Sequence, residues 1–344
     1  MSPRQFSNPG VTIPSSRLKH VTTNKKIINL HREKLSIIVP MFNEEDVIPT
    51  FFSEIMLVIE RLDLEWEIIC VNDGSRDRTW ELLTTCQKQD SRIKLVNFSR
   101  NFGKERALTA GIDYATGDAV VPIDADLQDP PEVIALMVAR WREGFDVVNA
   151  VRSNRKHDTL AKRLTAKMFY RVLNALSDVE IPADTGDFRL LSRRAYEALR
   201  ELGEQRRFMK GMFSWVGYPT ATVEYERKSR LAGSTKFNYW KLWNFAIEGI
   251  TSFSTAPLKV ASYVGLSSAF LSFCYAIVIV VKTIVYGNPV SGYPSLMTAI
   301  LFLGGVQLIF IGVVGEYIGR IHDEVKFRPI YIVESTRGFE NIPI

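Results

Sequence analysis

Apolar and polar positions alternate along the first half of the chain in a way that predicts an α/β fold. Short apolar runs rich in Val and Ile lie at 35–40, 66–71, 93–98, 119–123 and 145–150. Longer stretches with helical patterning, such as 44–62 and 130–141, separate them. Alternating strands and helices favour a Rossmann-like domain with a mainly parallel sheet. We predict that this domain occupies residues 35–235.

Two later runs are long enough to cross a bilayer. Val260–Val281 has 22 residues and Ser295–Gly315 has 21, all without a charged side chain. A hydrocarbon core of roughly 30 Å needs about 20 such residues in a helix. The turn-rich segment between the runs favours a membrane hairpin over a buried helix of a soluble domain. We therefore expect a two-helix transmembrane domain over 257–320.

Basic residues lie on one side of this predicted hairpin. Three precede the first run and three follow the second: Lys236, Lys241, Lys259, Arg320, Lys326 and Arg328. The positive-inside rule then predicts a multi-pass protein of the inner cell membrane with its main domain and both termini in the cytoplasm. Only the loop near 286–294 is expected outside. Lys282, at the outer edge, fits less well, although a lysine can extend its charge to the interface.

The remaining segments are interpreted from composition. The stretch 236–256 combines six aromatic side chains with few charges, which is typical of amphipathic helices lying at a membrane interface. Residues 1–34 carry seven Lys or Arg against one acid and are interpreted as a flexible basic tail. Residues 321–344 are interpreted as a cytoplasmic C-terminal tail.

Composition excludes several classes of function. The 43 basic and 38 acidic residues leave a net charge of +5, too small to indicate a nucleic-acid partner. Three separated cysteines without CxxC spacing argue against a disulfide framework or a zinc site. Four isolated histidines argue against a histidine-built metal centre, so any metal is expected to have oxygen ligands. The chain also has no GxGxxG after a strand and no complete P-loop.

Acidic residues gather where predicted strands end. Glu44 follows the first strand, Asp73 the second, and Asp124 and Asp126 the fourth. Ligands of parallel sheets bind at this edge, and a D-x-D pair suits a hard divalent cation on a diphosphate. Each residue also has a structural alternative: helix capping for Glu44, a turn for Asp73, and capping of the helix near Pro130 for the aspartates before it. We assign that cap to Asp129.

Five motifs in order make the pattern specific: "IVPMFNEE" (38–45), "VNDGSRD" (71–77), "RNFGKERAL" (100–108), "DADLQDPPE" (124–132) and "DTGDFRLL" (184–191). Together they resemble the inverting GT-A glycosyltransferases that move sugars onto polyprenyl phosphates. Within that group the chain is most similar to the bactoprenol glucosyltransferase type, and dolichyl-phosphate mannose synthases are more distant. The resemblance covers residues 35 to about 325.

This resemblance implies a set of donor-site residues. The nucleotide sugar is expected to contact Pro40, Glu44, Asp73, Lys104 and Asp124. The metal ligands are expected to be Asp124, Asp126 and Gln128, holding Mg²⁺ or Mn²⁺. Carboxylates can accept hydrogen bonds from a ribose or a uracil N–H, and an oxygen ligand can join a cation that already bridges two phosphates.

The resemblance also implies an acceptor site. Arg152 and Arg163 match positions that grip the lipid phosphate, a role that suits the arginine fork, although Arg163 lies in a basic helix and surface solvation is the alternative. Asp187 matches a position that either orients the nucleophile or acts as base, with stabilisation of a turn as the competing explanation. The basic stretch 227–237 is expected to face lipid headgroups.

The expected reaction is transfer of a hexose, glucose first, from a UDP-sugar to undecaprenyl phosphate, with inversion. Another donor, such as a UDP-aminoarabinose derivative or GDP-mannose, is the alternative, because specificity loops are not decoded by one sequence. A non-catalytic scaffold or flippase subunit is the rival from another class. The expected partners are the donor, the lipid acceptor, the bilayer and further copies of the chain as a homo-oligomer, without nucleic acid.

Overall fold

The structure is a computed structural model with an α/β domain and two long C-terminal helices. Contacts divide the chain into Met1–Arg32 and Glu33–Ile344, and everything below concerns the second unit. The described residues are 32–153, 185–205, 207, 209–226, 256–286 and 292–339. Several predicted features lie outside them: the basic tail, Arg163, the stretch 227–237, the interface segment up to residue 255, and most of the loop near 286–294.

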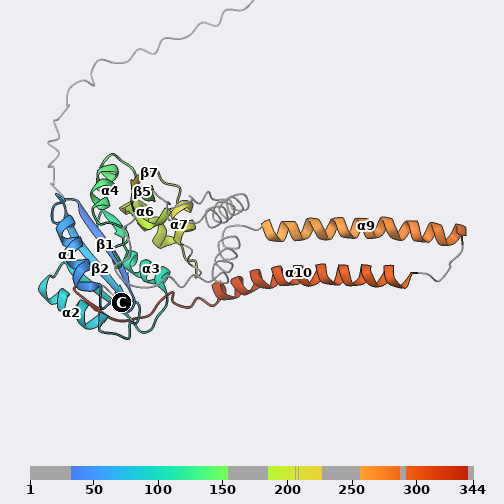
Figure 1. The fold of residues 1–344 in the computed structure, drawn as a ribbon, viewed down its shortest axis with the longest axis horizontal. Helices are drawn as coiled ribbons and strands as arrows, with labels where there is room; N and C mark the ends of the chain where they lie inside the picture. Colours follow the sequence, from blue (N-terminus) through green and yellow to red (C-terminus); the bar gives the residue numbers. More distant parts are fainter. Residues whose placement is uncertain are drawn as a thin grey trace, which may run out of the picture. The chain divides into compact units, whose positions relative to one another are not determined.

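All five predicted strands are present, and each contributes to one sheet (Figure 1). They are β1 (Lys34–Met41), β2 (Glu65–Asn72), β3 (Ile93–Phe98), β4 (Ala119–Pro122) and β5 (Val147–Arg152). Their central residues are buried on both faces, as expected for strands that read as continuous apolar runs. Strand β1 pairs in parallel with both β2 and β4, and β2 pairs in parallel with β3.

Three further strands were not predicted. They are β6 (Thr185–Ser192), β7 (Thr220–Tyr225) and β8 (Val333–Arg337), and the sheet order is β7-β5-β6-β4-β1-β2-β3-β8. Strand β6 lies between β4 and β5 and runs antiparallel to both. Its amino-terminal end therefore lies at the same edge as the carboxyl ends of the parallel strands. The sheet is mixed, with mostly parallel pairs.

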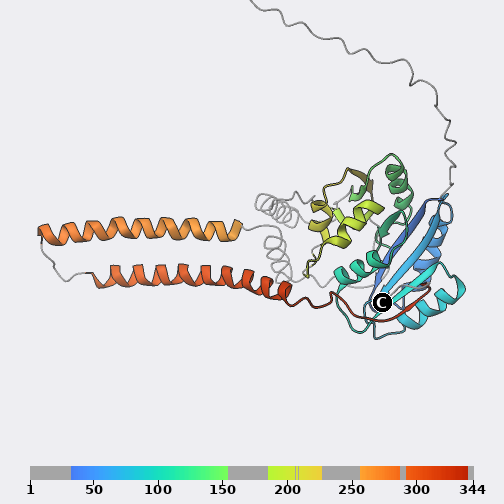
Figure 2. The ribbon, with the colours of Figure 1, turned by 180° about the vertical axis from the view of Figure 1, so that it is seen from behind.

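Helices cover both faces of the sheet (Figures 1 and 2). Alternate residues of β1 separate the two cores: Ile37 packs with one set of helices and Ile38 with the other. The first set is α1 (Ile48–Ile59), α2 (Thr79–Gln89) and α4 (Val133–Arg142). The second set is α3 (Lys104–Tyr114), α6 (Arg193–Glu201) and α7 (Met209–Trp215).

Helix α3 lies unusually close to the sheet because of a glycine. A Cβ built on Gly111 would lie 2.1 Å from Ile38 Cγ2, which is far inside van der Waals contact. Only glycine allows this approach without a shift of the Ile38 side chain or of the helix. The close packing fixes the start of α3, and therefore Lys104, relative to the end of β1.

The C-terminal segment is not a separate tail, which corrects the interpretation of 321–344. Strand β8 pairs antiparallel with β3 and forms the edge of the sheet. Near this strand, the ring of Tyr331 stacks on Phe98 at 5.0 Å between centroids, and its hydroxyl donates to Asp113 at 2.8 Å. The chain thus returns from α10 to complete the domain, a pairing that depends on contacts far apart in sequence.

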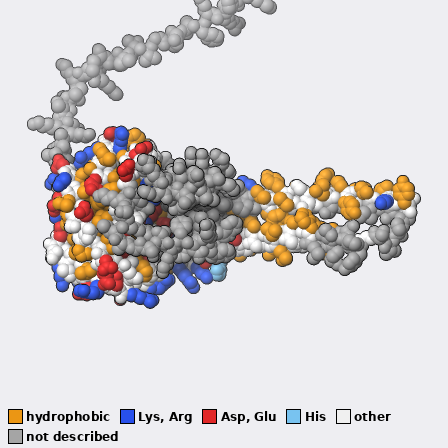
Figure 3. Space-filling model, in the orientation of Figure 1, with side chains coloured by type: hydrophobic (Ala, Val, Ile, Leu, Met, Phe, Trp, Pro, Cys, Tyr) orange, Lys and Arg blue, Asp and Glu red, His pale blue; other side chains and the backbone are white. Residues whose placement is uncertain are grey.

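The two long C-terminal helices are α9 (Ala256–Tyr286) and α10 (Tyr293–Val325), which contact one another. Their described apolar side chains are largely exposed, including Leu266 at 72% and Leu308 at 71%, and Figure 3 shows such side chains along both helices. Among the described residues, one helix is long and apolar enough to cross a membrane, Phe302–Val325. It overlaps the second predicted span. The arrangement with two spans stays a prediction.

Candidate active site

The loops after β1 and β2 are joined by reciprocal hydrogen bonds. The backbone N–H of Asn43 donates to Ser75 Oγ at 2.9 Å, and the N–H of Arg76 donates to Asn43 Oδ1 at 2.9 Å. The N–H of Glu44 donates to Thr79 Oγ1 at 2.9 Å. These bonds hold "FNEE" and "NDGSRD" as one rigid rim at the carboxyl edge of the sheet. The N-cap residue of α1 is Val47, and the carbonyl of Glu44 accepts the backbone N–H groups of Val47 and Ile48.

Asp73 organises the next motif rather than a turn of its own. Its carboxylate accepts hydrogen bonds from the backbone N–H groups of Phe102 at 2.6 Å and Gly103 at 2.9 Å. Burial raises the pKa of Asp73, and these two bonds oppose that rise. The neighbouring Gly74 has φ of +64°, and a Cβ there would lie 2.4 Å from the backbone carbon of Arg100. The loop carrying "RNFGK" can therefore pack this closely only against glycine.

The "DADLQD" segment leaves β4 through an unusual backbone conformation. Leu127 has φ of +53°, in the left-handed region that a branched apolar residue seldom occupies. Asp126 Oδ1 accepts the backbone N–H of Gln128 at 3.1 Å and so closes the turn around Leu127. Strain of this kind persists where surrounding contacts impose it, and it is common at functional sites.

The predicted metal ligands fit an oxygen-bound cation. Gln128 is buried, with 7% exposure, and its Oε1 has no hydrogen-bond partner in the described part of the protein. A buried amide oxygen in this state favours an additional ligand. Asp126 is partly exposed beside it. No group of three or more His, Cys, Asp or Glu residues that could hold a metal occurs within the described residues, so two carboxylates and one amide would need substrate oxygens to complete the site.

Lys104 joins two motifs that are far apart in the chain. Its Nζ lies 2.7 Å from Asp124 Oδ1 and 2.8 Å from Asp187 Oδ2. Burial raises the pKa of Asp124, whereas Lys104 lowers it. Burial disfavours the ammonium of Lys104, but the two carboxylates outweigh this effect and raise its pKa. The lysine is therefore charged at neutral pH and lies between the end of β4 and the start of β6.

Arg152 belongs to a second cluster, which also contains Asp129. The N-cap residue of helix α4 is Glu132, and capping by Asp129 stays a prediction. Asp129 Oδ1 accepts a short hydrogen bond from the Tyr225 hydroxyl, and Arg152 Nη2 lies 3.9 Å from the same oxygen. Arg152 Nε also donates to Tyr225 Oη at 3.3 Å. Parallel pairing of β5 with β7 places Arg152 opposite Tyr225.

A pocket of about 260 Å³ collects most of the predicted donor residues. Asp126 lies in its wall, whereas Gln128, Arg152 and Asp187 are not among its lining residues. The predicted residues that line it are Pro40, Glu44, Asp73, Lys104, Asp124 and Asp126. Arg163 lies outside the described residues, so its proximity to this pocket stays a prediction.

Sequence reasoning missed Arg189, although the quoted motif "DTGDFRLL" contains it. This arginine is 3% exposed, its guanidinium lies 4.0 Å from the centre of the Phe213 ring, and its Nη2 donates to the carbonyl of Gly186 at 2.7 Å. Burial lowers its pKa to about 10, and Asp187 opposes that shift. Arg189 therefore supports the strand start that carries Asp187. The signal available in the sequence was a charged residue, Arg189, next to the apolar run that follows it.

Two known protein families match separate parts of the chain. "Glycosyl transferase family 2" matches residues 36–200, and "GtrB C-terminal hairpin" matches residues 256–321. The first covers β1 to β6 with the acidic motifs, and the second covers most of α9 and α10. The fold is accordingly of the GT-A, Rossmann-like type.

Full-length relatives agree with these matches. A prophage-derived bactoprenol glucosyl transferase of Shigella flexneri is 53% identical over 306 residues, which cover 89% of this chain and 99% of that protein. An uncharacterized glycosyltransferase of Synechocystis is 54% identical over 90% of this chain and 98% of that protein. The solved mannosyl-3-phosphoglycerate synthase of Rubrobacter xylanophilus is 17% identical, covers 64% of this chain and 72% of that chain, and has a TM-score of 0.45. The chain is a glycosyltransferase. It belongs to glycosyl transferase family 2 and also carries a GtrB-type C-terminal hairpin.

Proposed function

We propose that this glycosyltransferase moves glucose from UDP-glucose to undecaprenyl phosphate, with inversion at the sugar. The support is the name and coverage of its relatives: several proteins called bactoprenol glucosyl transferase are 52–53% identical to it along 99–100% of their length. Membership of an enzyme family, with its acidic motifs intact, weighs against the scaffold alternative.

The observation that carries the proposal is the bridge from Lys104 to Asp124 and Asp187. Transfer from a nucleotide sugar builds negative charge on the departing diphosphate, and that charge must be compensated in a partly dry site. Lys104 is a fixed cation in the donor pocket, and its two carboxylate partners hold it there. Asp187, held by Lys104, would position the acceptor or accept a proton.

Asp124, Asp126 and Gln128 would hold Mg²⁺ or Mn²⁺ on the donor. When bound, such a cation neutralises diphosphate oxygens and so improves the leaving group. The unpartnered Oε1 of Gln128 supports this assignment more directly than the carboxylates do, because acidic side chains at a helix start also serve as caps.

Arg152, with Arg163, would bind the acceptor phosphate. Arg152 is half-buried, and burial disfavours its charge, while Tyr225 and Asp129 raise its pKa and keep it a cation. The lipid phosphate oxygen is already anionic near neutral pH, so a strong general base is less necessary than for a sugar hydroxyl. Orientation of that oxygen is then the main task of the acceptor site.

The hairpin of α9 and α10 would anchor the enzyme in the inner membrane by two spans, with the catalytic domain and both termini in the cytoplasm. Exposed apolar side chains along both helices support insertion in lipid. The positive-inside pattern supports the orientation. Association into a homo-oligomer remains an expectation.

The experiment uses the purified full-length enzyme with undecaprenyl phosphate and a panel of radiolabelled donors, comprising UDP-glucose, a UDP-aminoarabinose derivative and GDP-mannose. Transfer is measured as label that enters the organic phase. The proposal predicts the largest kcat/KM with UDP-glucose. Preference for another donor would reassign the sugar, and absence of lipid-linked label with every donor would contradict the reaction.

A further inference from the structure

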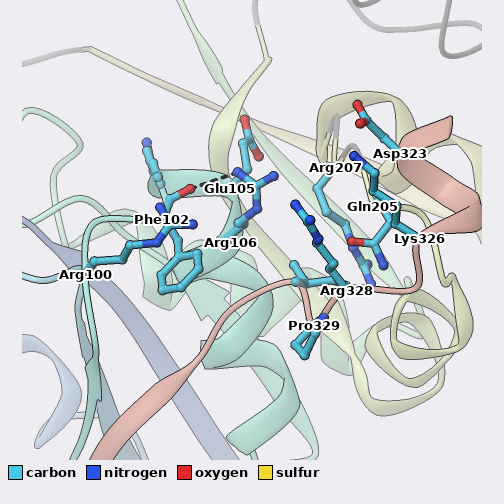
Figure 4. Close-up of a pocket in the computed structure, with 13 residues that line it drawn as sticks. Arg100, Phe102, Glu105, Arg106, Gln205, Arg207, Asp323, Lys326, Arg328 and Pro329 are labelled. Carbon is cyan, nitrogen blue, oxygen red and sulfur yellow. Dashed lines mark hydrogen bonds between the residues drawn. The ribbon is translucent and has the colours of Figure 1, made fainter. Parts of the chain in front are cut away.

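A second pocket lies where α10 ends. Its volume is about 520 Å³ (Figure 4). It has Gly103 and Lys104 in common with the donor pocket, and both pockets use the segment 100–107. The rest of its wall comes from outside the donor pocket, from Gln205, Arg207, Asp323, Lys326, Arg328, Pro329 and Ile330.

This second pocket is strongly basic. Its lining contains two carboxylates, Glu105 and Asp323, and six cations, of which Lys104 is already paired with Asp124 and Asp187. The cations are Arg100, Lys104, Arg106, Arg207, Lys326 and Arg328. In Figure 4 the side chains of Arg106 and Arg328 extend toward one another from α3 and from the segment after α10. Like charges converge in this way where an anion compensates them.

Neutral groups orient two of these arginines. Arg106 Nη1 donates to the carbonyl of Phe102 at 2.9 Å, and Arg207 Nη2 donates to the carbonyl of Leu202 at 2.6 Å. These carbonyl oxygens hold the two guanidinium groups in place but, because they carry no formal charge, they do not neutralise them. Arg207 Nε is also buried and has no hydrogen-bond partner within the described ranges. Burial lowers the pKa of Arg207, although nearby carboxylates oppose that effect, so a bound anion would favour its charged form.

The pocket is tied to the end of the apolar helix. The backbone N–H of Gln205 donates to the Glu324 carboxylate at 2.9 Å, which ties the last turn of α10 to Gln205. The membrane-length stretch Phe302–Val325 ends at this point, and the exposed Lys326 and Arg328 follow at once. A ligand that has both a phosphate and an apolar body matches this combination of surfaces.

We propose that this pocket binds the phosphate of an anionic phospholipid headgroup, as a site that adjoins the donor pocket and is distinct from the donor and acceptor sites. The N-terminus of α3, an eleven-residue helix that starts at Lys104, adds a favourable partial positive charge to the pocket. Occupancy does not require sugar transfer, so the binding test succeeds or fails independently of the proposed reaction.

The test counts bound lipids on the full-length protein in neutral detergent by native mass spectrometry. The probes are phosphatidylglycerol, phosphatidylcholine, inorganic phosphate and undecaprenyl phosphate. Arg328→Gln should weaken phosphatidylglycerol binding about tenfold, as loss of one charge-assisted contact implies. Arg328→Lys should recover part of it. Lys259→Gln, which removes an exposed charge at the start of the other helix, should change it less than about twofold, as surface charges do.

Four results would overturn the proposal: equal loss in Arg328→Gln and Lys259→Gln, equal binding of phosphatidylcholine, full displacement by millimolar inorganic phosphate, or a defect confined to undecaprenyl phosphate. The last would assign the pocket to the acceptor. If Arg328→Gln fails to fold, photo-crosslinking of the wild-type protein with a photoactivatable phosphatidylglycerol decides the question. Label on residues 323–330 supports the site, and label confined to other segments contradicts it.

Discussion

Lys104 at the start of α3 and Asp187 at the start of β6 form an ion pair of 2.8 Å, and the same ammonium lies 2.7 Å from Asp124. Without this lysine, Asp124 and Asp187 would lose a shared cation and would repel an anionic diphosphate more strongly. We expect Lys104→Ala to lower kcat/KM about a hundredfold, equivalent to about 2.7 kcal/mol.

Steady-state kinetics over a donor series measures this effect. Calorimetric titration with UDP-glucose should also show weaker binding. The matched control is Lys88→Ala, an exposed lysine of α2. Equal activity of Lys104→Ala and the control would remove Lys104 from the donor site.

Asp126→Asn is expected to reduce transfer by at least about a hundredfold while the protein stays folded, because weaker cation binding leaves the diphosphate without charge compensation. EDTA should stop the wild-type reaction, and Mg²⁺ or Mn²⁺ should restore it. Raising the Mn²⁺ concentration should partly rescue the variant.

The control for this variant is Asp46→Asn, an exposed aspartate on the loop before α1. Intrinsic Mn²⁺ binding, followed by electron paramagnetic resonance, gives a readout other than activity. Wild-type transfer that is indifferent to EDTA would rule out the metal assignment.

Arg152→Ala should separate acceptor binding from donor binding. Loss of a charge-assisted phosphate contact costs about 1.5 to 3 kcal/mol, so kcat/KM for the lipid should fall about ten- to a hundredfold. Affinity for UDP-glucose should change little, because Arg152 is not in the lining of the donor pocket. Calorimetric titration measures the affinity for UDP-glucose, and kinetics at varied lipid concentration measure kcat/KM for the acceptor.

Tyr225→Phe keeps the ring but removes the hydroxyl that contacts Arg152, so it should show a smaller defect of the same kind. Arg140→Ala on the outer surface of α4 is the neutral control. A collapse of donor affinity with normal lipid dependence would place Arg152 in the nucleotide site.

Glu67 gives a prediction on stability and pH. Its buried carboxylate accepts from Ser36 Oγ at 2.6 Å and pairs with Lys94 at 2.7 Å. Burial opposes ionisation, but these partners lower its pKa from 4.5 to about 2. Because the folded pKa is the lower one, the stabilisation is complete above pH 4.5 and is lost as pH falls toward 2. A shift of this size corresponds to about 3 kcal/mol.

Glu67→Gln should therefore lower the melting temperature at pH 7 and flatten its dependence on pH between about 5 and 2. Melting in detergent, followed by circular dichroism, checks both expectations. Glu65→Gln, an exposed residue of the same strand, is the control. An unchanged acid dependence in Glu67→Gln would assign that dependence to other carboxylates.

The membrane topology is tested by placing single cysteines. In a background without the exposed Cys274, Asn288→Cys should react in intact cells with an impermeant thiol reagent, and Arg230→Cys should react only after lysis. Labelling of position 230 in intact cells would invert the topology. Protection of both positions would place residue 288 away from the outer surface.

The sequence by itself determined the parts of the protein that local pattern controls. Continuous apolar runs predicted five strands, since buried parallel strands have no polar face. The acidic motifs after β1, β2 and β4 had to meet, because the carboxyl ends of parallel strands share one edge. The order of the motifs indicated the enzyme class that the family matches then established.

Tertiary structure decided what depends on contacts between distant segments. Asp187 reaches Lys104 because β6 is inserted antiparallel between β4 and β5, so the start of β6 lies at the active edge. Asp129 bonds to Tyr225 because the end of β7 lies beside β5. The C-terminal strand β8 pairs with β3 although its own sequence shows no strong strand pattern. Such a strand pairs with the sheet edge that the rest of the fold leaves open. The local sequence does not specify that edge.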